Sequence, residues 1–301
     1  MSKKPLKYKP DFLMIGAQKS GTSWLWYNLR KHKDIWLTPQ KEIHYFSRSP
    51  RYPSPNTLSN KYFFNRILQK GYLVSLIRHL GNAVKRNDWQ EFGWYIRYFF
   101  GTYNDRWYSA LFKQAKGKIK GEITPVYSIL DYEDVKHISE LFPDIKIIFI
   151  LRNPVERAWS QIRFGLMKRF NEQINTGIIK DFIDSPGQML RGDYNRTLSI
   201  WKKCFPSEQI YIGFYDQLYE EPTEFLNDIL NFLNIVDYEN IEYSGVNDKR
   251  NVSKQVTIPS EIEYYLAEKY YPEIRKLTSE IGGYSKEWLS ITESILNKRD
   301  F

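Results

Sequence analysis

Short apolar runs alternate along the chain with longer segments in which apolar residues recur every three or four positions. The runs occupy residues 11–16, 146–151 and 209–215. All three runs predict strands, and the run 146–151, which is continuously apolar, predicts a strand that is buried on both faces. Helical spacing appears in segments 24–32, 134–141, 155–167 and 225–233. This alternation indicates an α/β protein, a parallel sheet with helices on both faces.

Residues 48–108 do not fit the alternation. The segment begins with prolines at 50, 53 and 55 and is rich in aromatic residues between 89 and 107. We predict that it is an insertion of one or two helices, a lid or substrate subregion, on a single domain spanning 1–301. Two other interpretations remain: the aromatics form a core of their own, or the apolar stripe with its flanking basic residues makes a peripheral membrane contact through 70–100.

Composition narrows the class of protein. The 301 residues are 42% hydrophobic and 26% charged, which excludes a disordered or low-complexity chain. A single cysteine, Cys204, excludes an internal disulfide and a cysteine-rich metal site. Lys and Arg exceed Asp and Glu by 44 to 35, so the partner is expected to be anionic. No apolar stretch approaches the ~20 residues of a membrane span, and the start lacks a signal-peptide pattern, which together predict a cytoplasmic location.

The first predicted strand and helix are joined by a loop typical of anion sites. Free backbone N–H groups and the helix dipole meet at such a junction. Its glycines, cation and hydroxyls are Gly16, Lys19, Ser20, Gly21, Thr22 and Ser23. The lysine precedes the second glycine by two residues, whereas in nucleotide triphosphate loops it follows directly. The run 146–151 ends in Arg152 rather than a metal-binding Asp, so no metal is predicted.

Two separated motifs resemble the sulfotransferases that use 3′-phosphoadenosine 5′-phosphosulfate. Lys19-Ser-Gly-Thr-Ser-Trp24 is similar to the loop for the 5′-phosphosulfate, which implies that these six residues, Trp24 included, contact the donor. Ile148-Phe-Ile-Leu-Arg152-Asn-Pro-Val-Glu-Arg-Ala-Trp-Ser160 is similar to the strand and helix for the 3′-phosphate, which implies roles for Arg152 and Ser160. A residue at a strand end and one about two helical turns onward can face one pocket. The expected fold is therefore P-loop-like.

Weaker matches extend this resemblance. Gln40-Lys-Glu42-Ile-His44-Tyr-Phe46 is similar to a stretch of the heparan sulfate branch in which the Glu is the catalytic base. An extended backbone here would point His44 to the same side as Glu42, so His44 would orient the acceptor or be the base itself. Late in the chain, Lys249 and Arg250 fall where the family carries a loop over the 3′-phosphate.

The resemblance implies in-line sulfuryl transfer from that donor, without metal, releasing adenosine 3′,5′-bisphosphate, with Lys19 at the bridging oxygen. The acceptor would offer a hydroxyl, or less favourably an amine. Ile123 stands where heparan-modifying enzymes carry Lys, which favours a small molecule, a glycolipid or an uncharged carbohydrate. The alternative enzyme is a P-loop kinase using ATP and Mg²⁺. A nucleic-acid-binding protein would explain the charge, but its motifs are absent from the sequence.

Overall fold

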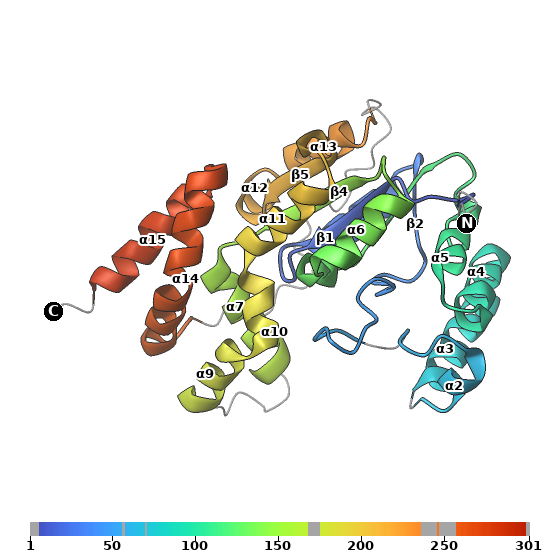
Figure 1. Ribbon diagram of the computed structural model, residues 1–301, viewed down its shortest axis with the longest axis horizontal. Coiled ribbons are helices and arrows are strands. Elements are labelled where there is room, and N and C mark those ends of the chain that lie inside the picture. The colour runs from blue at the N-terminus through green and yellow to red at the C-terminus, as the bar shows by residue number, and fades with distance from the viewer. Residues whose placement is uncertain are drawn as a thin grey trace.

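The protein is built on a five-stranded parallel sheet (Figure 1). A computed structural model describes residues 6–55, 58–69, 71–167, 175–235, 246 and 257–298. The strands are β1 (Phe12–Gly16), β2 (Ile35–Leu37), β3 (Ile119–Ile123), β4 (Lys146–Leu151) and β5 (Ile210–Phe214). Their order in the sheet is β2-β3-β1-β4-β5, and every pairing is parallel.

Helices cover both faces of the sheet, as the sequence predicts. The helices among the described residues are α1 (Thr22–Lys31), α2 (Phe63–Ile67), α3 (Tyr72–Lys85), α4 (Trp89–Phe100), α5 (Asp105–Ala110), α6 (Tyr132–Leu141), α7 (Pro154–Ile162), α9 (Thr176–Asp184), α10 (Pro186–Gly192), α11 (Tyr194–Cys204), α12 (Tyr215–Glu220), α13 (Pro222–Phe232), α14 (Ser260–Ile281) and α15 (Ser285–Asn297). Short 3₁₀ turns occupy Lys113–Ala115, Pro125–Ile129 and Ser207–Gln209, and a π-helical turn, Arg163–Met167, continues α7.

The continuous apolar runs are explained by a core on each side of the sheet. In β4, Ile147 and Phe149 belong to a core with residues of α6, α7 and α11, whereas Ile148 belongs to a core with residues of α1 and α13. All three are fully buried. Successive strand side chains point to opposite faces, so a strand covered on both sides needs apolar residues at every position.

The sheet order places the ends of β1 and β4 side by side. β1 lies at the centre and pairs with β3 on one side and with β4 on the other. The chain leaves β1 toward β2 and leaves β4 toward β5, in opposite directions across the sheet. Crevices at such a reversal, beyond the carboxyl ends of the strands, are the usual ligand sites of parallel sheets.

The segment between β2 and β3 contains α2, α3, α4 and α5 (Figure 1). Within residues 48–108 the structure completes three helices before α5 ends, where the sequence suggests one or two. Its aromatics pack on the main core rather than apart from it, because Trp94, Tyr98 and Trp107 share a cluster with Tyr45 and Phe46 of the loop after β2. Among the described residues, no helix is both long and apolar enough to cross a membrane.

Candidate functional site

The loop between β1 and α1 has the geometry of an anion site. Gly21 is the N-cap of α1 in the left-handed conformation, with φ 78°, and no side chain caps the helix. This left-handed conformation favours glycine, and a Cβ on Gly21 would in addition lie 2.8 Å from Leu218 Cδ1, so that the Leu218 side chain would have to shift. The uncapped N–H groups at the start of α1 are therefore left for a ligand.

Cations surround this loop. Burial first, and then Arg152, Arg163 and Lys41, lower the pKa of Lys19 to about 8. The Arg152 Nη1 donates to the Lys19 carbonyl at 3.1 Å, and its guanidinium lies 4.4 Å from the Tyr215 ring centre. Mutual repulsion among so many positive groups is relieved when an anion binds.

The hydroxyls of the loop differ in their availability. Ser20 Oγ is fully buried and has no hydrogen-bond partner among the described residues. A buried hydroxyl without a partner is costly, so it fits a loop that completes its hydrogen bonds with a phosphate or sulfate oxygen. Thr22 is also buried, while Ser23 Oγ accepts a hydrogen bond from Lys41 Nζ at 3.0 Å.

Of the other residues predicted to hold the donor, some lie near the loop and others do not. Arg152 reaches the loop directly, and Ser160 lies half-buried two turns along α7. The Trp24 indole is instead buried against Phe225 and donates to the Val246 carbonyl at 2.8 Å, so its side chain belongs to the core. The predicted Lys249 and Arg250 lie outside the described residues.

Glu42 and His44 meet, but not through an extended backbone. Both have left-handed φ values, 62° and 59°, so the expectation that they share one side of an extended segment is wrong. The turn nevertheless brings His44 Nε2 to 3.5 Å from Glu42 Oε2. On its other side, His44 Nδ1 lies 3.4 Å from Ser54 Oγ and 3.5 Å from Ser47 Oγ.

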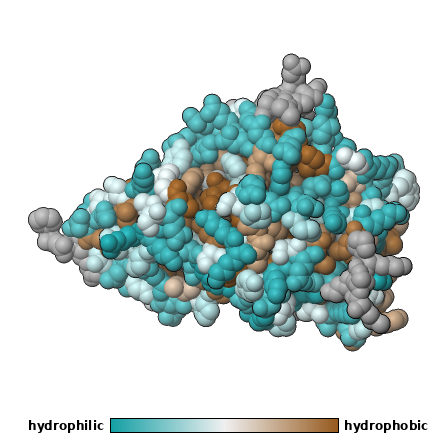
Figure 2. Space-filling view, turned by 45° about the horizontal axis from the view of Figure 1, so that its top comes forward, coloured by the Kyte–Doolittle hydropathy of each residue, from teal (hydrophilic) through white to brown (hydrophobic). Residues whose placement is uncertain are grey.

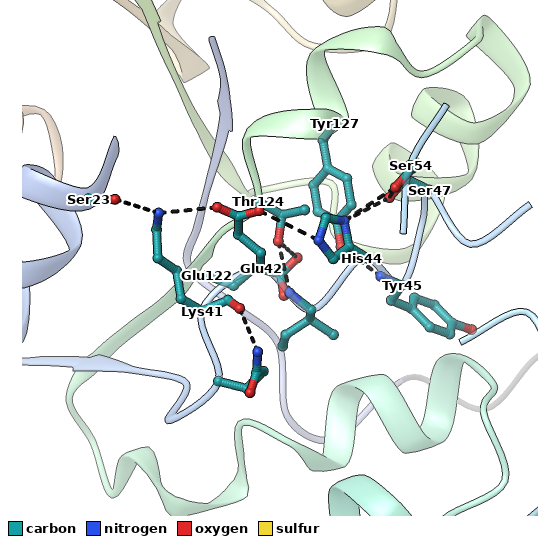
Figure 3. Close-up of polar contacts among 12 residues, drawn as sticks. Ser23, Lys41, Glu42, His44, Tyr45, Ser47, Ser54, Glu122, Thr124 and Tyr127 are labelled. Atoms are coloured by element: carbon teal, nitrogen blue, oxygen red, sulfur yellow. Dashed lines mark hydrogen bonds and ion pairs between the residues drawn. The ribbon is translucent and has the colours of Figure 1, made fainter. Parts of the chain in front are cut away.

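Lys41 connects this pair to the anion loop (Figure 3). Its Nζ donates to Ser23 Oγ at 3.0 Å and to Glu42 Oε1 at 3.1 Å. Burial by itself would raise the pKa of Glu42, but the hydrogen bond from His44 and the charge of Lys41 outweigh it and hold the pKa below its ordinary value. Glu42 is thus a carboxylate at neutral pH, within two hydrogen bonds of the loop.

The turn that carries Glu42 is held by the residues that end and follow β3. The Glu42 N–H donates to the Ile123 carbonyl at 3.1 Å, and the Ile43 N–H donates to Thr124 Oγ1 at 3.1 Å. The Tyr45 N–H donates to the Tyr127 hydroxyl at 3.0 Å. Together these three contacts, which we call the β3 strap, fix the backbone on both sides of His44; Figure 3 shows Thr124 and Tyr127 beside this turn.

Beneath the β3 strap lies a fully buried carboxyl group. Burial raises the pKa of Glu122 to about 8, although the hydroxyls of Tyr127, Tyr108 and Thr124 partly offset it. Glu122 is therefore protonated at neutral pH, as a carboxyl without a cationic partner in the core should be.

Sequence reasoning misses several of these roles. It assigns no role to Lys41, Thr124 or Tyr127. The signal for Lys41 is its place directly before Glu42, but nothing local shows that its amine reaches Ser23. Ile123 packs in the core beside α1, so packing alone explains an apolar residue there and the inference from Ile123 to acceptor charge loses its basis.

The comparisons with known proteins show the family of this chain. The profile described as "Sulfotransferase family" matches residues 10–239, which include the anion loop, the Glu42 turn and Arg152. The chain therefore belongs to the sulfotransferase family, a family of sulfuryl-transferring enzymes, and the predicted family resemblance is confirmed.

Curated relatives match only parts of longer proteins. The membrane-associated sulfotransferase kil1 of Dictyostelium discoideum is 30% identical over 157 residues, 52% of this chain and 23% of that protein. The human bifunctional heparan sulfate N-deacetylase/N-sulfotransferase 3 is 26% identical over 247 residues, 77% of this chain and 23% of that protein. The match thus covers less than a quarter of the length of either relative.

Solved structures share the fold. A sulfotransferase from Alicyclobacillus acidocaldarius superposes with a TM-score of 0.62 at 21% identity, covering 93% of this chain and 98% of that one. The sulfotransferase domain of the Synechococcus PCC 7002 olefin synthase gives a TM-score of 0.52 at 15% identity, covering 90% and 97%. These likenesses confirm the predicted fold class.

Proposed function

We propose that this protein transfers a sulfuryl group from 3′-phosphoadenosine 5′-phosphosulfate to the hydroxyl of an acceptor. The observation that carries the proposal is the bridge made by Lys41, whose Nζ contacts both Ser23 of the anion loop and the Glu42 carboxylate. This bridge supports the proposal that an anionic donor would bind beside a group able to take a proton from the acceptor.

The residues present fit this donor. The unpartnered Ser20 hydroxyl, the uncapped start of α1 and the Lys19 amine would receive the phosphosulfate end. Arg152, with Ser160 further along α7, would receive the 3′-phosphate. The Arg152 Nε and Nη2 donate to the exposed Glu156 Oε2 at 3.2 Å and 3.0 Å, and the phosphate would take the place of that carboxylate. Among the described residues, no group of three or more His, Cys, Asp or Glu side chains is placed to hold a metal ion.

When bound, the donor supplies the sulfuryl group and a bisphosphate leaving group. Lys19 would neutralise the charge that grows on the bridging oxygen between phosphorus and sulfur as the bond from this oxygen to sulfur breaks. Glu42 would accept the proton of the attacking hydroxyl, and His44 would hold the carboxylate and the acceptor in place. The lowered pKa of Glu42 keeps it ionised and able to accept that proton at neutral pH.

Binding of the product nucleotide tests the donor half of the proposal. Adenosine 3′,5′-bisphosphate should raise the melting temperature in the presence of a chelator, whereas ATP with Mg²⁺ should raise it much less, because only the preferred ligand stabilises the folded state strongly. Arg152→Ala should lose most of this shift, and Lys276→Ala, on α14, should keep it. A shift with ATP and Mg²⁺ alone would favour the kinase.

Transfer itself is tested with donor labelled in the sulfuryl group. Small phenols, simple sugars and glycolipids would be offered separately, and label should appear in one of these classes. A protein that binds the bisphosphate but transfers label to none of them, nor to amines, would contradict the acceptor class and leave the donor assignment standing.

A further inference from the structure

The segment between β2 and β3 exposes far more apolar surface than its fold requires. Four of its side chains are at least two-thirds exposed: Phe64 79%, Leu68 87%, Val74 69% and Ile77 68%. Tyr62, Leu73, Val84, Trp89, Ile96 and Phe100 are exposed to a lesser degree. Figure 2 shows brown, hydrophobic side chains reaching the surface at the right of the molecule, the end where Figure 1 places these helices.

The exposed residues follow the geometry of their helices. In α3, Leu73, Ile77 and Val84 are spaced four and seven residues apart and so share one face, with Val74 beside them. Phe64 and Leu68, four apart, share one face of α2, and only Gln69 to Gly71 separate α2 and its C-cap from α3. We call Phe64, Leu68, Leu73, Val74 and Ile77 the α2–α3 apolar face.

The opposite sides of the same helices pack in the core. In α3, Tyr72 and Ala83 are buried, and α4 buries Trp94 and Phe99. The fully buried Arg66 ties α2 to the end of α4 through bonds to the Phe99 and Gly101 carbonyls, each 2.8 Å. The α2–α3 apolar face is therefore held rigidly outward, and apolar patches of this kind mark interaction sites.

The charges around the α2–α3 apolar face indicate the kind of partner that it binds. Lys61, Arg78, Lys85 and Arg86 are exposed. Among the described residues from 61 to 100 the only carboxylates are Asp88, which caps α4, and Glu91, which is buried and pairs with Arg86 at 2.7 Å. No exposed carboxylate thus accompanies the exposed cations in this described stretch.

We propose that the α2–α3 apolar face with its cationic rim docks the protein on the surface of a bilayer that contains anionic lipids. Leu68, Val74 and Ile77 enter the boundary between headgroups and acyl chains, and Arg78 and Lys85 contact the anionic headgroups. Two copies of this chain would instead bring identical cationic rims together, which opposes self-association through this face.

Sedimentation of the full chain with vesicles tests the proposal. Vesicles of phosphatidylcholine with phosphatidylserine should carry the protein down, vesicles of phosphatidylcholine alone should do so at least ~10-fold less, and added salt should release it. Absence of sedimentation with the anionic vesicles overturns the proposal.

Matched variants locate the contact. Combined Leu68→Ser, Val74→Ser and Ile77→Ser should reduce binding at least ~10-fold, and so should Arg78→Glu with Lys85→Glu. Ile291→Ser removes an exposed apolar residue of α15, 52% exposed, and Lys276→Glu reverses an exposed charge of α14, and both should leave binding unchanged. Equal losses in the controls, or retained binding in the first two variants, would contradict the location.

Two further measurements distinguish a membrane contact from misfolding of the variants and from self-association. The melting temperature without ligand should be nearly the same in all variants, which shows that they fold and keeps this test independent of the proposed function. Sedimentation equilibrium should find the same mass for the wild type and the serine variant. A dimer that the serine substitutions dissolve would assign the face to a second copy and overturn the membrane proposal.

Discussion

Glu42 and His44 lie within 3.5 Å of each other, and the proposed reaction would give them different tasks. If Glu42 takes the acceptor proton, Glu42→Gln should lower turnover about 10²-fold to 10⁴-fold, because the amide keeps the size but cannot accept a proton in this way. His44→Ala should cost less, and bisphosphate affinity should change little in both. Steady-state kinetics with labelled donor would measure this. A nearly active Glu42→Gln beside an inert His44→Ala would make His44 the base.

The pKa of Lys19, near 8 without ligand, predicts a pH dependence of donor-site binding. A bound anion favours the charged amine and raises this pKa, so above pH ~8 binding must take up a proton and affinity should fall as pH rises. Below that pH Lys19 is charged in both states, and this contribution disappears. Calorimetric titration with adenosine 3′,5′-bisphosphate from pH 7 to pH 9.5 would show the decline. Lys19→Arg, which stays charged, should abolish it, and a decline of the same size in that variant would assign the effect elsewhere.

Among the elements, the β3 strap predicts that a residue outside the anion loop controls turnover. Thr124→Val keeps the shape but removes the oxygen that accepts the Ile43 N–H, so the Glu42 turn loses a fixed point. Turnover should fall about 10-fold or more, since small misplacements of catalytic groups are costly, while bisphosphate affinity stays the same. Thr124→Ser keeps the hydroxyl and should restore most of the rate. A Ser variant as slow as the Val variant would refute positioning through this hydroxyl.

For the whole molecule, Glu122 makes stability depend on pH. Its pKa is raised from 4.5 to about 8 in the folded protein, so between these values the folded state keeps a proton that the unfolded chain has lost, and the free energy of unfolding decreases as pH rises. Glu122→Gln removes this contribution. Denaturant unfolding should therefore show that the free energy of unfolding of the variant, relative to that of the wild type, increases by ~1 kcal/mol or more from pH 5 to pH 8.

A surface variant serves as the control for that measurement. Glu268 is exposed on α14, so the stability difference between Glu268→Gln and the wild type should stay flat over the same range. If the free energy of unfolding of Glu122→Gln instead decreased relative to the wild type as pH rises, Glu122 would be needed as a carboxylate. Its assignment as a neutral core group would then fail.

The sequence by itself determined the parts of this protein that depend on local pattern. β1, β4 and β5 follow from apolar runs, and in β1 and β4 the runs are continuous because a strand covered on both faces must be apolar throughout. The anion loop and Arg152 follow from residue types placed at strand ends, where parallel topology brings them together. β3 is not predicted from the sequence, because Lys120, Gly121 and Glu122 interrupt its apolar pattern. Only burial beneath the β3 strap makes Glu122 a neutral core residue.

Tertiary structure alone decided how the Glu42 turn is built. Neither the left-handed backbone at Glu42 and His44 nor the reach of Lys41 to Ser23 can be inferred from spacing, because each depends on contacts between segments that are distant in the chain. The same holds for the α2–α3 apolar face. The helical period of α3 predicts an apolar stripe, but only the packing of its opposite side on α4 decides that this stripe faces outward.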